Sequence, residues 1–198
     1  VPMNLVPMVL VNGSNGERSY DIYSRLLRDR IVMLNGAIDE SSAALVISQL
    51  LFLQAENPKA DIHIYVNSPG GAVVDGLAIV DCMELSTCDI HTYSVGQCAS
   101  MGCVILAAGT KGKRHALASS RLMLHQVASS TQGAVEDMKR NVKEADRLNR
   151  YLAGKLAAFT GQSLKKISAD MDRDFFLSAP EAVAYHLVDD ILTKKQGS

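Results

Sequence analysis

Two successive strand–turn–helix patterns constrain the fold of this chain more than any other feature. Each pattern combines an apolar, β-branched run, a turn of small or polar residues and an apolar run of helical length. Two such units in succession favour a layered α/β domain, in which the helix N-termini lie at one edge of the sheet and both turns can face one cleft. The first unit has its strand over residues 61–66, its turn over 67–71 and its helix over 73–85, and the second has the same elements over 89–95, 96–99 and 101–108.

The flanking segments predict further helices and strands. A long helix is predicted over residues 134–159, because apolar residues recur there at steps of three and four, and Gly161 suits its C-terminal cap. Ser178 and Glu181 have the spacing of a capping box, which predicts that the last helix begins there. The remaining predictions are a turn or loop at 12–16, an amphipathic segment at 20–27, a strand at 31–34, a helix that opens at Asp39 or Ser41 and stops near 57, two short apolar stretches within 114–125 and a final strand at 188–192.

The composition is that of one ordinary globular domain over residues 1–198, of which 47% are hydrophobic and 21% charged. A formal net charge of −1 argues against a nucleic-acid or anionic-membrane partner. No apolar run approaches the roughly 20 residues that span a bilayer, and the N-terminus does not resemble a secretory signal. The sequence contains no Cys-x-x-Cys pair, so we expect reduced thiols in a cytoplasmic protein.

Ser100 stands at the turn of the second unit, where the following helix would begin. There a serine hydroxyl can point into a cleft, and the free amides of the first helical turn can stabilise a developing negative charge. An ordinary N-cap would place a serine at the same position. Cys98 and Cys103 flank Ser100 and could compete with it as nucleophiles, or they could pack as small buried hydrophobic residues.

The turn of the first unit contains Gly70 and Gly71, which would let the backbone approach a ligand closely. An oxyanion hole needs two N–H groups near the nucleophile, and the amides of Gly71 and Met101 are the candidates. A plain tight turn would also explain the two glycines. Neither turn matches a phosphate-binding motif, and residues 109–114 imitate one only weakly.

A nucleophilic serine needs a general base, and the base needs a carboxylate that holds it in the right tautomer. His125 ends an apolar stretch, where a polar ring at the edge of a cleft is expected. His63, His91 and His115 lie in or near predicted strands, where partly exposed or hydrogen-bonded rings are common. Three carboxylates precede the apolar run at 175–177, namely Asp170, Asp172 and Asp174. Spacing does not choose among them, and a solvated acidic turn would also explain the cluster.

Together these motifs closely resemble the proteolytic subunit of the Clp protease family. The resemblance rests on residues 99–102, 124–126 and 172–178, in the order serine, histidine, aspartate, and on residues 17–27 and 67–71. It covers residues 5–192, which is nearly the whole chain. It implies a serine endopeptidase in which Ser100 is the nucleophile, His125 the base and Asp174 the orienting acid, with the amides of Gly71 and Met101 at the oxyanion.

The resemblance also implies a fold and an assembly. The fold would be the crotonase-like stack of ββα units, with a projecting long helix at 134–160 that joins two rings. The chain would form a homo-oligomer of two stacked heptameric rings around a chamber. An AAA+ unfoldase of the ClpX, ClpA or ClpC type would feed unfolded polypeptide through axial loops formed by residues 1–18. No metal or cofactor is expected in this chain, because ATP would belong to the partner.

Further residue roles follow from the resemblance alone. The chain departs from the usual family pattern at residues 127–130, where Pro and a glycine pair are common, at position 63, which is usually aromatic, and at position 186, which is usually Gly. The implied roles are substrate binding by Gly70, Gln126 and Val127, unfoldase docking by His63, Tyr65, Leu85 and Leu192, and ring–ring contact by Asp172 and Arg173.

Two other interpretations share parts of this pattern. A non-catalytic ring subunit of the same family would have the fold but would lack triad residues, whereas this chain has a candidate at each of the three positions. A crotonase-type acyl-CoA enzyme would share the fold and the amide hole but would not need this triad. An active-site serine probe distinguishes both from a serine endopeptidase.

Overall fold

The computed structural model describes residues 5–13 and 16–194 of the chain. Within these residues a seven-stranded sheet has the order β3-β4-β5-β6-β9, and β7 pairs with both β5 and β8. The pairing is parallel except between β7 and β8, which are antiparallel. The strands are β3 (Ile31–Asn35), β4 (Ile62–Ser68), β5 (Ile90–Ala99), β6 (Arg114–Leu117), β7 (Arg121–Leu124), β8 (Phe175–Ser178) and β9 (Asp190–Leu192).

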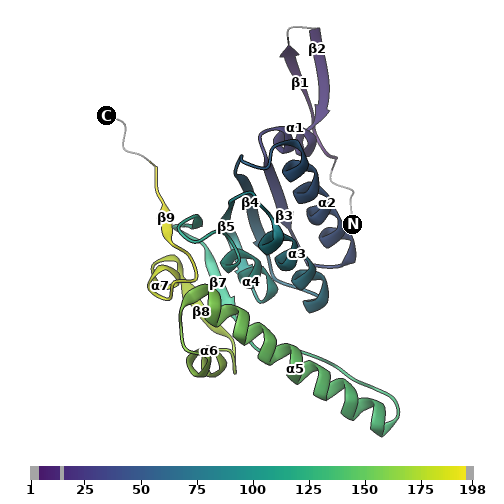
Figure 1. Cartoon of the computed structure of the whole chain (residues 1–198), viewed down its shortest axis with the longest axis vertical. Helices are drawn as coiled ribbons and strands as arrows, with labels where there is room; N and C mark the ends of the chain where they lie inside the picture. Colours follow the sequence, from purple (N-terminus) through teal and green to yellow (C-terminus); the bar gives the residue numbers. More distant parts are fainter. Residues whose placement is uncertain (1–4, 14–15, 195–198) are drawn as a thin grey trace.

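Helices cover one face of this sheet, and Figure 1 shows α2, α3 and α4 side by side over it. In β4 the side chains of Ile62, Ile64 and Val66 are buried, whereas His63 and Tyr65 point to the opposite, partly exposed face. We call this second face the open face of the sheet. The helices are α1 (Ile22–Arg28), α2 (Glu40–Glu56), α3 (Val73–Leu85), α4 (Met101–Ala107), α5 (Val135–Thr160), α6 (Leu164–Asp170) and α7 (Ala179–Ala184).

The two predicted strand–turn–helix units are β4–α3 and β5–α4, and the α/β class with a parallel sheet is confirmed. The predicted turn at 96–99 is wrong, because β5 continues to Ala99. Gly96 has a φ of 72°, and beyond it β5 leaves its pairing with β6 and pairs with β7. A glycine tolerates this backbone conformation, so the strand can change neighbours without ending.

The predicted helix termini at 39, 161 and 178 are confirmed. Asp39 caps α2, Gly161 ends α5 with a left-handed φ of 72°, and Ser178 forms a capping box with Glu181 at α7. The sequence did not predict α6 or β8, and it did not predict the antiparallel hairpin of β1 (Met8–Gly13) and β2 (Gly16–Asp21). Residues 1–4 and 14–15 of the predicted axial-loop segment lie outside the described residues.

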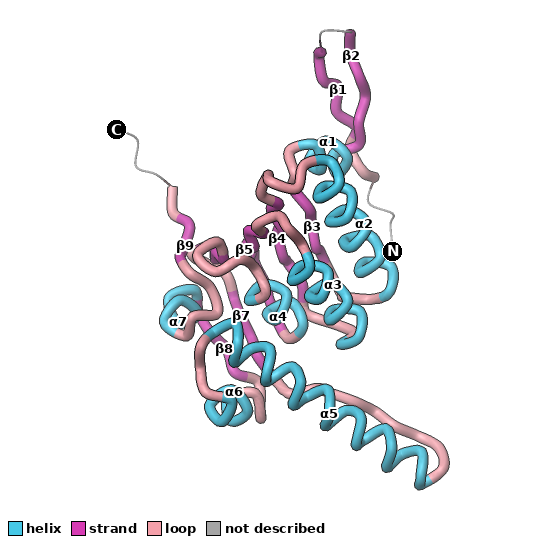
Figure 2. The backbone as a smooth tube through the Cα atoms, in the orientation of Figure 1, coloured by secondary structure: helices cyan, strands magenta, loops and turns pink. Residues whose placement is uncertain are grey.

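The hairpin and α5 extend from opposite ends of the molecule (Figure 1). The buried residues of α5 are Leu152, Ala153, Leu156 and Thr160, all in its C-terminal third. Its N-terminal part projects, and Figure 2 shows the preceding loop running back along it. None of the helices in the described part of the chain combines the length and the apolarity that a membrane span needs.

Candidate active site

Ser100 occupies a strained turn between β5 and α4. Its backbone has φ 53° and ψ −124°, a combination that is unfavourable for a residue with a side chain. Although Ser100 lies at the N-cap position of α4, its hydroxyl is directed at His125, and the Ser100 Oγ–His125 Nε2 distance is 2.9 Å. An N-cap hydroxyl would instead accept from the helix amides. The strain therefore accompanies a serine that faces an imidazole.

Parallel strand pairing brings His125 to Ser100. The last residues of β5 pair with β7, with Cys98 opposite Leu122 and Ala99 opposite Met123. The N–H of Ser100 continues this ladder and donates to the carbonyl oxygen of Met123 at 2.8 Å. Because both strands run in the same direction, the residues that follow them lie at the same edge of the sheet.

Antiparallel pairing brings Asp174 to the other side of His125. Strand β8 pairs with β7 so that Phe175 lies opposite Leu124, which places Asp174 beside His125. The His125 Nδ1–Asp174 Oδ1 distance is 3.4 Å, and the Asp174 side chain is 58% exposed. This distance is longer than a strong N–H···O hydrogen bond. The other two candidates are engaged elsewhere, since Asp170 accepts from Tyr185 and the carboxylate of Asp172 lies 3.7 Å from Arg173.

The glycine turn packs directly against Ser100. A Cβ atom on Gly70 would lie 2.6 Å from the Cβ of Ser100, and one on Gly71 would lie 2.1 Å from the carbonyl oxygen of Ile38. Neither position can therefore accept a side chain without a backbone shift. Ile38 holds the turn by donating to the Gly70 oxygen at 2.9 Å and accepting from Ala72 at 2.8 Å.

These backbone bonds do not use the N–H of Gly71, which stays available to a ligand. The N–H of Met101 is at the first position of α4, where an amide has no acceptor inside its own helix. Both amides border the same cavity as Ser100. The arrangement can therefore present two donors to an oxygen that develops negative charge.

A cavity of ≈ 220 Å³ opens beside Ser100 and His125. Much of its wall is apolar, because aliphatic side chains of α4, β7 and α5 meet there. An aliphatic or thioether side chain of a bound ligand would lose water on entering it. The apolar lining includes Val73, Met101, Val104, Leu124, Val127, Leu152, Leu156 and Met171.

The neighbouring cysteines are buried thiols. Cys98 and Cys103 are both 0% exposed, and the Cys103 thiol donates to the carbonyl oxygen of Cys98 at 2.8 Å. Burial raises the pKa of Cys98 well above its usual value. Because the thiolate is the reactive form, this environment favours a structural role. The segment at 109–114, which weakly resembles a phosphate-binding loop, already uses its amides within the protein, since those of Gly112 and Arg114 donate to Asp189.

Residues after His125 are tied to two other elements. Gln126 Nε2 donates to the carbonyl oxygen of Asp172 at 2.8 Å, and the N–H of Val127 donates to Oδ1 of Asn149 at 3.0 Å. Sequence reasoning missed Asn149. It lies within a polar stretch of the long helix, and only the fold brings it to the loop.

The remaining predicted site residues do not line this cavity, although Asp172 and Arg173 border an adjoining hollow with His125 and Gln126. His63, Tyr65 and Leu192 are on strands of the sheet, whereas Leu85 ends α3 in the helix layer and is 82% exposed. Asp172 and Arg173 lie in the exposed loop between α6 and β8. Among the described residues, no group of three or more histidine, cysteine or acidic side chains is arranged to hold a metal ion.

Comparisons with known proteins relate the whole chain to one group of peptidases. Residues 14–195 match the family model described as Clp protease. The chain is 50% identical over 191 residues to the ATP-dependent Clp protease proteolytic subunit 2 of Chlamydia pneumoniae. This match covers 96% of this chain and 94% of that protein.

Proposed function

The chain belongs to the Clp protease family, and we propose that Ser100, His125 and Asp174 carry out its peptide-bond hydrolysis. The observation that carries this proposal is the 2.9 Å distance between Ser100 Oγ and His125 Nε2. A strained turn presents this serine at the mouth of an apolar cavity, next to two available amides. Such strain is common where a backbone positions a reactive group.

The geometry supports a two-step acyl transfer. His125 Nε2 takes the hydroxyl proton while Ser100 Oγ attacks the peptide carbonyl carbon, and the carbonyl electron pair moves to oxygen. The N–H groups of Gly71 and Met101 then stabilise the oxyanion. His125 gives the proton to the leaving amine, and a water that His125 activates in turn releases the acyl group from Ser100.

The contact between Asp174 and His125 is the part of the triad that is still loose in the single chain. At 3.4 Å from Nδ1 of His125, Asp174 lies within ion-pair distance, but it is too far away to make a strong hydrogen bond. Its loop also carries Asp172 and Arg173, which are exposed in the single chain. We assign these two residues to the contact between rings, so that assembly would bring Asp174 closer to His125.

The substrate is an unfolded polypeptide bound in extended form. The cavity of ≈ 220 Å³ suits an aliphatic or thioether side chain next to the bond that is cut. Gln126 and Val127 line this cavity, and Gly70 directly precedes Gly71, which also lines it. These three residues are the proposed substrate-binding residues. The peptidase domain comprises residues 1–198, and no metal or cofactor takes part.

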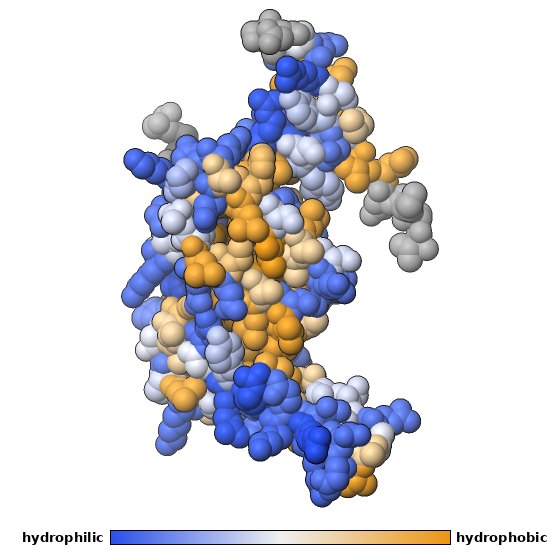
Figure 3. Space-filling model, turned by 45° about the vertical axis from the view of Figure 1, so that its right-hand side comes forward, coloured by the Kyte–Doolittle hydropathy of each residue, from blue (hydrophilic) through white to orange (hydrophobic). Residues whose placement is uncertain are grey.

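The surface supports assembly from copies of this chain. Figure 3 shows an apolar area between hydrophilic ends of the molecule. On α2 the side chains of Leu45, Leu51 and Phe52 are 62%, 57% and 54% exposed, and Leu45 lines a cavity of ≈ 410 Å³. Exposed apolar area of this kind is typical of an interface. The proposed assembly is the two stacked heptameric rings of the family, with α5 joining the rings.

The partner in ATP-dependent degradation is an AAA+ unfoldase in the cytoplasm. His63, Tyr65, Leu85 and Leu192 form its proposed docking residues. The β1–β2 hairpin overlaps the proposed axial-loop segment 1–18, continues to Asp21 and exposes Met8 and Leu10. ATP binding belongs to the unfoldase, so short peptides should be cut without ATP.

The test is peptide hydrolysis by the purified protein, combined with its mass in solution and labelling by a serine-directed fluorophosphonate. Ser100→Ala should lose labelling and reduce turnover by on the order of 10⁴-fold or more, because the residues of a triad act as a unit. Cys103→Ala removes a neighbouring thiol and serves as the matched control. Wild-type turnover in Ser100→Ala, or its loss in Cys103→Ala alone at unchanged mass, would contradict the assignment.

A further inference from the structure

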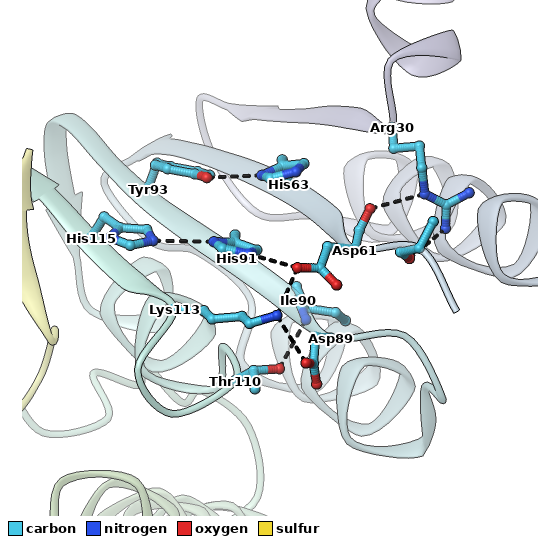
Figure 4. Close-up of polar contacts among 11 residues, drawn as sticks. Arg30, Asp61, His63, Asp89, Ile90, His91, Tyr93, Thr110, Lys113 and His115 are labelled. Atoms are coloured by element: carbon cyan, nitrogen blue, oxygen red, sulfur yellow. Dashed lines mark hydrogen bonds and ion pairs between the residues drawn. The ribbon is translucent and has the colours of Figure 1, made fainter. Parts of the chain in front are cut away.

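A continuous row of polar side chains crosses the open face of the sheet at some distance from Ser100 (Figure 4). Asp61 Oδ2 lies 3.0 Å from Nε2 of His91, and Nδ1 of His91 lies 3.2 Å from Nε2 of His115. Nδ1 of His115 in turn contacts Oδ1 of Asp190. All four ring nitrogens of the two histidines therefore lie within a row that has a carboxylate at each end.

Parallel pairing of four strands produces this row. His63 in β4 lies opposite His91 in β5, and His115 in β6 lies opposite Asp190 in β9. The rings of His91 and His115 are nearly parallel, with centroids 5.5 Å apart. The row therefore connects the short edge strand β9 to the middle of the sheet.

Counting protons shows which charge state fits this geometry. With both carboxylates ionised and therefore only able to accept, the contact with Asp61 needs a proton on Nε2 of His91, and the contact with Asp190 needs one on Nδ1 of His115. The contact between the rings needs one further proton, which lies between the two facing nitrogens. Two neutral imidazoles carry one ring proton each. Three hydrogen bonds thus require one proton more than the neutral pair holds.

The surroundings keep the terminal carboxylate at Asp61 from supplying that proton. Lys113 Nζ lies 2.6 Å from Asp61 Oδ2 and 2.9 Å from Asp89 Oδ2. The hydrogen bond from Lys113, with a further one from His91, lowers the pKa of Asp61. An ionised Asp61 can accept a hydrogen bond from His91 but cannot donate one.

Lys113, which shares Oδ2 of Asp61 with His91, is the positively charged neighbour of the pair, and its charge is offset by Asp61 and Asp89. The aromatic groups beside the pair add no further positive charge. The ring of His63 stacks on His91 at 4.7 Å, and Nδ1 of His63 lies 2.8 Å from the hydroxyl of Tyr93. Burial, followed by the neighbouring His91, lowers the pKa of His63. Tyr93 also stacks on Tyr65 at 4.4 Å, and burial raises the pKa of Tyr93. The aromatic neighbours of the pair thus favour uncharged forms.

We propose that His91 and His115 share one extra proton at neutral pH, and that this singly protonated pair holds the edge strand β9 to the centre of the open face. Loss of the proton at alkaline pH leaves two lone pairs facing each other, or a lone pair facing a carboxylate. Gain of a second proton at acid pH sets two N–H groups against each other. The row is complete only between these limits, which makes it a pH-sensitive device.

The proposal that the device controls docking rests on the proposed function, because Leu192 on β9 and His63 beside the pair are docking residues there. The proton sharing itself does not depend on that function. The two parts therefore need separate measurements.

The first measurement is the thermal unfolding midpoint of the full chain between about pH 7 and pH 9, where free histidine, with a pKa of about 6.5, is largely neutral. The folded protein would hold a proton that the unfolded chain does not, so stability must fall as the pH rises. The wild-type midpoint should fall more than that of His115→Gln. The difference should be roughly 3–6 °C for each factor of ten by which the folded protein binds the proton more tightly than the unfolded chain does. Asp190→Asn should also flatten the curve, whereas His186→Gln, at an exposed histidine, should follow the wild type.

If the curves of wild type, His115→Gln and Asp190→Asn ran parallel, the proton sharing would be excluded, whether or not the protein hydrolyses peptides. The second measurement compares unfoldase-dependent protein degradation with hydrolysis of a short peptide over the same pH range. In the wild type, protein degradation should decline more steeply with rising pH than peptide hydrolysis does. In His115→Gln the two activities should decline to the same extent. Equal decline in the wild type would overturn the link to docking, and absent peptide hydrolysis would overturn only the proposed function.

Discussion

At the scale of single residues, His186 carries a backbone cost that its side chain does not offset. It follows α7 with a φ of 62°, in the left-handed region. The N–H of His186 donates to Val183 and that of Leu187 to Ala182, each at 2.9 Å, which is the hydrogen-bond pattern of a Schellman motif. This position favours glycine, because a Cβ atom is unfavourable there.

His186→Gly should therefore stabilise the protein, by about 0.5–1 kcal/mol, since relief of the left-handed strain exceeds the added flexibility of the unfolded chain. The unfolding midpoint should rise by about 1–4 °C. His186→Ala is the matched control, because it removes the imidazole but keeps the Cβ. Equal midpoints for the glycine and alanine variants would show that the backbone at this position is not strained.

The reactive residues show how far residue-level reasoning reaches. Ser100 could be proposed from its turn and the following helix, but neither His125 nor Asp174 could be selected from spacing alone. His125 reaches Ser100 through β5–β7 pairing, and Asp174 reaches His125 through β7–β8 pairing. These strand neighbours are far apart in sequence, so only the resemblance to a family selected the residues before the structure was known.

At the scale of elements, α5 supports the active site through Asn149. Its Oδ1 accepts from the N–H of Val127, two residues after His125. Nearer the tip, Nδ2 of Asn141 donates to the hydroxyl of Thr131 at 3.1 Å, in an exposed contact between the same helix and the same loop. The Asn149 contact lies next to the buried part of α5, so it fixes the loop where the loop borders the cavity.

Asn149→Leu should reduce kcat/KM by on the order of tenfold, because the unpaired N–H of Val127 lets the loop shift and small displacements at a reacting centre are costly. Asn149→Asp keeps an acceptor and should retain most of the activity. Asn141→Ala removes the exposed contact and should have little effect at unchanged solution mass. Equal losses in Asn149→Leu and Asn149→Asp would show that the hydrogen bond does not position the loop.

The elements that sequence reasoning missed share a physical cause. Helix α6 and strand β8 are short, so they show too little periodicity to be predicted, and β8 is stabilised by pairing with β7. The β1–β2 hairpin exposes apolar residues such as Met8 and Leu10, so a pattern based on one buried face does not reveal it. Helix α5, by contrast, has apolar residues at steps of three and four and was predicted from them, and helices α2 and α3 were predicted from long apolar runs bounded by turn residues.

At the scale of the whole molecule, Arg114 joins parts of the chain that are distant in sequence. Its side chain is 2% exposed, and its Nε and Nη2 donate to Asp189 at 2.9 and 2.7 Å. Nη1 donates to the carbonyl oxygens of Phe159, at the end of α5, and Ala107, at the end of α4. The sheet and the base of the long helix are therefore held by one charged cluster whose hydrogen bonds offset the cost of burial.

Removal of the carboxylate charge in Asp189→Asn should destabilise the protein by about 3–5 kcal/mol at neutral pH, because Arg114 is left as a buried charge without its partner. Burial alone would raise the pKa of Asp189, but the hydrogen bonds from Arg114 and from the Gly112 amide outweigh it and lower the pKa below 3.8. Since the folded pKa is the lower one, this stabilisation is fully present above the unfolded pKa and is lost as the pH falls through the folded pKa. In urea unfolding followed from about pH 7 to about pH 2, the midpoints of wild type and Asp189→Asn should therefore converge below about pH 4.

The control is Asp29→Asn, which removes an exposed ion pair with Arg25 and should show only a small gap from the wild type at every pH. A gap between wild type and Asp189→Asn that stayed constant into acid would mean that the charge of Asp189 does not stabilise the fold.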